Sequence, residues 1–257
     1  MLIQSVLKAA SPYLQGRKVK DVVIGISLIA VELDNGDVAV SYVLREGLKA
    51  GCSIFPYGQN IIGQDAADIV NWIVSGEDDL QKGIGMAVLC AASRAQNLED
   101  CQTSEKPFGV TVKDTDIVGM IGFISGVAKI MGSLSKELYI FDKGISQSDG
   151  TKGPVLPMED QPRLLPKCDI VLASGTTIVN GSIDGILKMC SNAREIIIIG
   201  PSTPMFPKAF MDSKVTVLAG SWWKNQHKDT IFKKISLASG ISELREFAIK
   251  KSVRVGL

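Results

Sequence analysis

The chain has 257 residues, of which 46% are hydrophobic and 21% charged, as in an ordinary globular protein with one large core or two small ones. Lysine and arginine number 28 against 27 aspartates and glutamates, so no net charge draws the chain to nucleic acid. No apolar stretch reaches the ~18 residues that cross a bilayer. We therefore expect a cytoplasmic protein that binds neither nucleic acid nor a membrane.

The first hundred residues predict a small α+β domain. An amphipathic helix is expected over residues 1–15, because its apolar residues fall at helical spacing. Alternating runs with a tight-turn signal between them predict an antiparallel meander, and two helices should follow, the second rich in glycine and alanine that allow close packing. The expected strands span 19–28, 29–33 and 38–43, and the expected helices 65–74 and 80–95.

The rest of the sequence, residues 101–257, predicts a Rossmann-like domain with a parallel sheet. Residues 97–115 are polar and aperiodic, which places the boundary between domains 1–100 and 101–257. Short runs that are apolar throughout, separated by helical patterns, indicate parallel strands buried on both faces. We expect strands at 116–122, 138–141, 169–173, 196–199 and 215–219, and helices at 126–134, from 180, and at 242–250.

Two of these strands end in turns rich in glycine and hydroxyl residues. Ligands of open parallel sheets bind at the carboxyl ends of the strands, so these turns form our candidate site. The alternatives are ordinary capping of the next helix for the first turn, and a rigid structural loop for the second, which has two prolines. The candidates are Gly175, Thr176, Thr177, Asn180 and Gly181 in the first turn, and Gly200, Pro201, Ser202, Thr203 and Pro204 in the second.

The first βα turn of this domain adds two candidates. Its glycines are spaced GxxGxxxG, which differs from the GxGxxG nucleotide motif, but Gly122 at a strand end still lets a backbone approach a ligand. Asp142 ends the next strand, where doubly wound folds place an acid on a ribose hydroxyl. That position suits NAD or S-adenosylmethionine. The other interpretation is an acid that only caps the following turn.

Three segments together resemble a known family. The stretches DIVGMIGFISG (116–126), GTTIVNGSIDGIL (175–187) and GPSTPMFP (200–207) are similar to the DUF364 family, also called the heavy-metal chelation domain. Residues 1–95 are similar to the enolase N-terminal-like, DUF4213-type domain that usually precedes it. The resemblance implies a Rossmann-like domain, a cleft shared by both domains, and a role in metal chelation or in processing a small chelating molecule.

Direct ligation of a metal by the protein is not favoured by the sequence. The five cysteines are scattered without a CxxC pair, and a histidine site or a catalytic triad would depend on the one histidine, His227. Binding of an organic molecule that itself chelates metal fits these residues better. The cysteines are Cys52, Cys90, Cys101, Cys168 and Cys190.

Three functions remain open at this point. The first is an enzyme of condensation, hydrolysis or group transfer on a pterin-, flavin- or siderophore-like compound in the interdomain cleft. The second is a non-catalytic carrier of a metal–chelate complex, and the third an S-adenosylmethionine-dependent methyltransferase. No nucleophile lies beside a base, so catalytic residues and cofactor are not identified. Acid–base candidates are Glu46, Asp142, Lys143 and Asp184.

Two further features have alternative interpretations. Arg45, Glu46 and the stretch Tyr57–Asn60 of the first domain either reach across the cleft or are plain surface residues. Trp222 and Trp223, with Met205 and Phe206, form either an apolar surface for a homo-oligomer or part of the core.

Overall fold

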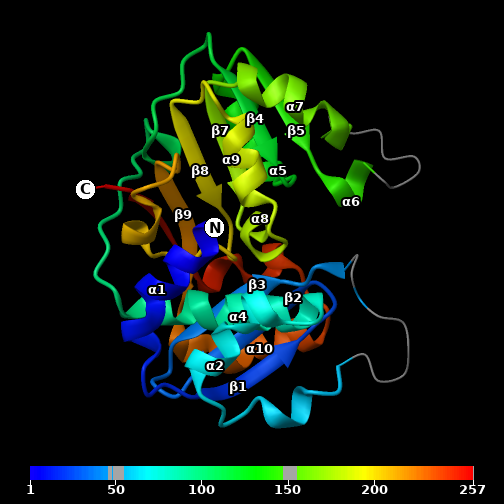
Figure 1. Ribbon diagram of the computed structural model, residues 1–257, viewed down its shortest axis with the longest axis vertical. Coiled ribbons are helices and arrows are strands. Elements are labelled where there is room, and N and C mark those ends of the chain that lie inside the picture. Colours follow the sequence, from blue (N-terminus) through cyan, green and yellow to red (C-terminus); the bar gives the residue numbers. More distant parts are fainter. Residues whose placement is uncertain (46–47, 49–54, 147–154, 257) are drawn as a thin grey trace.

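The computed structural model describes residues 1–45, 48, 55–146 and 155–256, and shows two sheets (Figure 1). In the described part of the chain, the first sheet has three strands and the second has seven. The expected α/β architecture, a small α+β unit followed by a Rossmann-like unit, is confirmed. No helix of the described residues is both long and apolar enough to cross a membrane.

The first sheet is the antiparallel meander that the alternating runs predict. Gly36 has a φ of +85°, which a turn between adjacent antiparallel strands requires and glycine adopts without strain. The predicted helix at 65–74 is split in two at Asn71. The elements are α1 (Leu2–Leu14), β1 (Val19–Ile24), β2 (Leu28–Leu33), β3 (Val38–Tyr42), α2 (Ala66–Val70), α3 (Trp72–Ser75) and α4 (Asp79–Ala92).

Helices cover both faces of this sheet. All six residues of β2 are buried, because α4 packs on β2 and β3 while α10 (Lys228–Ser236) packs on β1 and β2. A Cβ added to Gly83 of α4 would lie 2.7 Å from Ile29, so the close packing expected of this glycine-rich helix is confirmed. On the α10 side, Lys228 Nζ lies 2.5 Å from Asp21 Oδ2 and 3.5 Å from the buried Glu32 carboxylate.

The second sheet has the order β10-β9-β8-β7-β4-β5-β6, and all its neighbouring pairs are parallel except β9 and β10. Its inner strands are buried on both faces, which explains why their sequences are apolar without alternation. The strands are β4 (Ile117–Ile121), β5 (Glu137–Phe141), β6 (Val155–Leu156), β7 (Ile170–Ser174), β8 (Glu195–Ile199), β9 (Val217–Trp223) and β10 (Ala248–Arg254). The helices are α5 (Ser125–Leu134), α6 (Lys143–Ser146), α7 (Gln161–Leu164), α8 (Thr176–Val179) and α9 (Ile183–Met189).

Two expectations about this sheet are corrected, and one open alternative is decided. The helix predicted at 242–250 is a 3₁₀ segment, Ile241–Phe247, followed by β10, which pairs with β9 along its whole length. The helix predicted from Asn180 begins at Ile183 as α9, and a separate short helix, α8, precedes it, because Gly181 has a φ of +74° that interrupts helical geometry. Of the two interpretations of Trp222, Trp223, Met205 and Phe206, the structure agrees with the core, since all four residues are buried.

One helix from each end of the chain packs against the unit formed mainly by the other end. The amino-terminal helix α1 packs against η7 (Pro207–Phe210), a short 3₁₀ segment of the β8–β9 connection, whereas α10 packs on the first sheet. Figure 1 shows α1 beside β8 and β9, and α10 beside β1. The domain boundary near residue 100 stays a prediction, and this exchange of helices means that the two units share their cores.

Candidate ligand-binding site at the strand edge

The strand order reverses between β4 and β7. From β4 the chain proceeds outward through β5 to β6, and from β7 it proceeds in the opposite direction through β8 to β9. In open α/β sheets this reversal leaves a crevice outside the carboxyl ends of the two central strands, where ligands bind. Figure 1 shows the arrowheads of β7 and β8 directed toward the first sheet. The candidate residues therefore lie at the edge that faces the first domain.

Gly122 and Ser174 lie side by side at this reversal. Gly122 follows β4 with a φ of +88°, and Ser174 is the last residue of β7. A Cβ on Gly122 would approach the Cβ of Ser174 to 2.8 Å. Position 122 therefore requires glycine for two reasons: its backbone conformation is strained for other residues, and a side chain would have no room.

Asp142 holds the loop that follows β4. Its Oδ2 accepts a hydrogen bond of 2.8 Å from the backbone N–H of Phe123, so the acid at the end of β5 fixes the loop that leads into α5. Asp142 is half-buried and Phe123 is exposed. This bond joins Asp142 to the loop after β4 and not to the turn that follows Asp142, so both the predicted turn cap and the predicted contact with a ribose stay predictions.

The first hydroxyl-bearing turn is partly open. Thr176 Oγ1 donates to Ser174 Oγ at 2.9 Å, at a half-buried position beside Gly122. Thr177 is buried, and its hydroxyl donates to the Ser174 carbonyl at 2.7 Å, so its role is local. Asn180 and Gly181 are exposed, and Asn180 Oδ1 accepts the Ser182 N–H at 3.0 Å. Thr176 and Asn180 are thus the side chains of this turn that a ligand can reach.

The second turn is packed against the first domain. Ser202 Oγ accepts the Tyr42 N–H at 3.0 Å and lies 3.1 Å from Ser41 Oγ, so the hydroxyl is bonded to β3. Ser202 and Thr203 are each 1% exposed, and Pro201 and Pro204 are also buried. Their predicted role as ligand contacts stays a prediction, but their hydroxyls are inaccessible here. Gly200, half-buried with a φ of +110°, is the accessible residue of this turn.

The two turns do meet. A Cβ on Gly175 would overlap the Ser202 carbonyl and lie 2.8 Å from the Thr203 nitrogen, so Gly175 lets the backbones touch. The sequence contains no signal that pairs Ser202 with Tyr42, since 160 residues separate them.

Other candidates lie away from this edge. Asp184 accepts the Leu2 N–H at 3.2 Å and so caps α1. Tyr57 bonds to Glu77 at 3.2 Å, and this neighbouring carboxylate raises the pKa of the tyrosine. That contact lies within the first domain, and the role of Tyr57–Asn60 stays a prediction. Arg45 is exposed, and Glu46 lies outside the described residues.

The described residues do not offer a direct metal site. Among them, no three His, Cys, Asp or Glu side chains form a group that could hold an ion. Burial raises the pKa of Cys168 to about 12 and that of Cys190 to about 11, so both thiols are protonated at neutral pH. The thiolate is the form that binds soft metals. The described residues therefore do not fit a heavy-metal ion bound by side chains alone; Cys52 lies outside them.

Two family models match this chain. A family model described as "DUF364: Putative heavy-metal chelation" matches residues 107–254, and "DUF4213", with the same description, matches residues 7–93. The uncharacterised protein MJ0500 of Methanocaldococcus jannaschii is 26% identical over 183 residues, which are 69% of this chain and 68% of that protein.

Two crystal structures of DUF364 proteins of unknown function have the same fold. PH1506 of Pyrococcus horikoshii has a TM-score of 0.76 at 21% identity, and the match covers 99% of this chain and 100% of that one. The protein from Desulfitobacterium hafniense DCB-2 has a TM-score of 0.75 at 16% identity, with the same coverage. At these identities the likeness shows the fold alone.

Proposed function

We propose that this chain, which belongs to the DUF364 family, binds a small organic molecule that chelates a metal ion, and that it does so at the edge formed by Gly122, Asp142 and Thr176. The family description connects its members with heavy metals without naming a ligand. The observation that supports the proposal is the position of these residues at the reversal point of the sheet.

The chemistry of this edge suits a polar organic ligand. Thr176 offers a hydroxyl, Asn180 an amide, and the loop after Gly122 lets a ligand approach backbone atoms. Binding sites of this kind place a few polar groups to fix orientation, which is what pterin, flavin and catechol rings require. The metal would then be held by the organic molecule, because the described side chains do not form a cluster of metal ligands.

Calorimetric titration tests this proposal with three kinds of probe: Fe(III) alone, organic chelators alone, and their complexes. The chelators are 2,3-dihydroxybenzoate, a pterin and flavin mononucleotide. We expect a chelator or its complex to bind while the ion alone does not. Binding of the bare ion with the same affinity as its complex would contradict the proposal, and so would the absence of binding by every organic probe.

Matched variants test the location. Thr176→Val and Asn180→Ala should weaken the binding of the probe, because both residues are accessible at the strand edge. Thr115→Val and Asn192→Ala are the controls, since both residues are exposed and precede β4 and β8 at the opposite edge of the sheet. Equal affinities in all four variants would place the ligand elsewhere.

A second candidate function is the binding of S-adenosylmethionine for methyl transfer. Asp142 at the end of β5, the strand next to β4, supports it, because an acid at this position bonds ribose hydroxyls in doubly wound folds. The same titration with S-adenosylmethionine tests it. If the parent chain binds S-adenosylmethionine and the Asp142→Asn variant does not, the methyltransferase function is supported. If the parent chain does not bind it, this function is excluded.

A further inference from the structure

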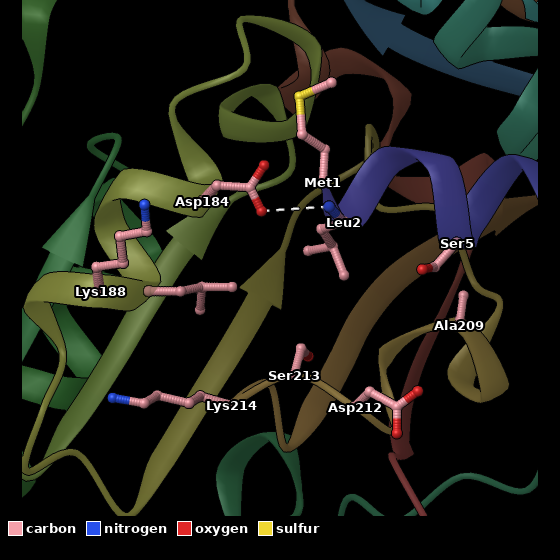
Figure 2. A pocket seen from close by; sticks show the side chains of 10 residues that line it. Met1, Leu2, Ser5, Asp184, Lys188, Ala209, Asp212, Ser213 and Lys214 are labelled. Atoms are coloured by element: carbon pink, nitrogen blue, oxygen red, sulfur yellow. Dashed lines mark hydrogen bonds between the residues drawn. The ribbon is translucent and has the colours of Figure 1, made fainter.

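A hollow lies away from the strand edge, between α1, α9 and the β8–β9 connection. It has a volume of about 580 Å³, within the ~300–1,000 Å³ typical of small-molecule pockets. Its walls come from the first turns of α1, from α9, from η7, and from the turn before β9. Figure 2 shows the side chains of these segments around it.

The hollow arises from an unusual connection in the sheet. The β8–β9 connection contains only the short η7, where a parallel pair is usually joined by a crossover helix. The helix α1 packs against η7 in this connection, and Asp184 of α9 holds its first turn by accepting the Leu2 N–H. The pocket lies where α1 and α9 adjoin.

The floor of this pocket is apolar and its rim carries both signs of charge. Leu2 and Leu187 line the hollow and are 8% and 9% exposed, and Figure 2 shows Leu2 directed into it. Figure 2 also shows Lys188 and Asp212 on opposite sides. Both are exposed at the rim.

Lys214 and Asp184 of the lining are already bonded, and the α-ammonium group of Met1 is a further cation of the lining. Lys214 Nζ donates to the Cys190 carbonyl at 3.3 Å, and Asp184 accepts from Leu2. Within the described residues, the side chains of Lys188 and Asp212 form no hydrogen bond or ion pair. These two side chains therefore offer a cation and an anion to a ligand across an apolar floor.

We propose that this pocket binds a short zwitterion with an aliphatic body, of the dipeptide kind. The carboxylate of the ligand pairs with Lys188, its ammonium group pairs with Asp212, and its side chains cover Leu2 and Leu187. Opposite charges at both ends fix the direction of the ligand, since the reversed orientation would place like charges together. This site is separate from the strand edge and does not depend on the function proposed there.

The experiment is a calorimetric titration of the full chain with leucyl-leucine and two blocked forms. N-acetyl-leucyl-leucine lacks the ammonium group, and leucyl-leucine amide lacks the carboxylate. We expect the free dipeptide to bind about threefold to fivefold more tightly than either blocked form, the range for partly exposed ion pairs. Free leucine tests whether one residue suffices. Equal binding of all forms, or no binding of the dipeptide at millimolar concentrations, would overturn the proposal.

Two variants test which end of the ligand pairs with each charged side chain of the pocket. Lys188→Gln should remove the preference for the free carboxylate, and Asp212→Asn should remove the preference for the free ammonium group. Lys136→Gln and Asp114→Asn are the matched controls, because both residues are exposed and lie outside the pocket. All four variants should keep the thermal midpoint of the parent chain. Unchanged preferences in the two pocket variants would show that the ligand binds elsewhere.

Discussion

The two turns at the carboxyl edge of the parallel sheet have similar residues and opposite environments. In the first, Thr176 is half-buried and Asn180 is exposed, whereas in the second Ser202 and Thr203 are each 1% exposed. The second turn bonds to β3 through Ser202, and the first does not. Composition therefore predicts that both turns lie at the edge, but packing decides which of them can contact a ligand.

The largest expected effect concerns the point where the turns touch. Gly175→Ala should reduce the free energy of unfolding by about 2–4 kcal/mol, because the new methyl group overlaps backbone atoms of residues 202 and 203 that cannot move away cheaply. Urea denaturation measures it.

Gly185→Ala is the matched control for this change. Gly185 lies in α9 with open space around it, so alanine there should be neutral or stabilising by up to ~1 kcal/mol. If Gly175→Ala proved as harmless as Gly185→Ala, the two turns would not be in contact.

The next effect tests the buried turn. Ser202→Ala should cost about 1–3 kcal/mol of stability, because the Tyr42 N–H loses its acceptor inside the protein. Chemical denaturation checks this, with Ser133→Ala as the control on the exposed face of α5, where the change should stay within about 0.5 kcal/mol. A Ser202→Ala variant as stable as the control would mean that the bond to β3 contributes nothing.

The open turn should show the opposite behaviour. Thr176→Val should change the stability by less than about 1 kcal/mol, since its hydroxyl bonds only to Ser174 at a half-buried position. The same variant should weaken the binding of the chelator probe by about tenfold, or 1.4 kcal/mol. Calorimetry measures both properties. A loss of stability with unchanged binding would reverse the roles assigned to the two turns.

The last prediction concerns the buried thiols, whose ionisation has no effect on stability at neutral pH. Because burial raises the pKa of Cys168 and Cys190 to about 12 and about 11, each thiol stays neutral below the ordinary value of 9.0. Its contribution to stability is present there and is lost as the pH rises toward the folded value.

Thiolate absorbance as a function of pH checks these values. Cys168→Ala and Cys190→Ala should leave binding of the metal–chelate complex unchanged. Thiolate formation near neutral pH, or loss of metal binding in either variant, would indicate direct ligation by sulfur.

The sequence predicts the strands well and the packing between distant segments poorly. The central strands are recognisable because burial on both faces makes them apolar throughout, as at 196–199. The alternation that identifies β10 is short and contains Lys250 and Lys251, which explains why a helix was expected there. The edge position of β10 explains the lysines, since charged residues discourage further strand pairing.

The position of the candidate residues in the fold is predictable from the sequence, but their packing is not. Glycine and hydroxyl residues at strand ends indicate one common edge of the sheet, because the carboxyl ends of parallel strands lie together. The burial of Ser202 depends on β3, which lies 160 residues earlier. The hollow beside Leu2 depends on the packing of α1 against the distant segment η7, which no local pattern reveals.

A crystal structure of the protein with the Fe(III) complex of 2,3-dihydroxybenzoate tests the central claim most directly. We expect density for the complex at the carboxyl ends of β4 and β7, in contact with the Gly122 backbone and the Thr176 hydroxyl, with the ion held by the catechol oxygens. An iron ion bound only by protein side chains, or a complex located away from these two strand ends, would contradict the account.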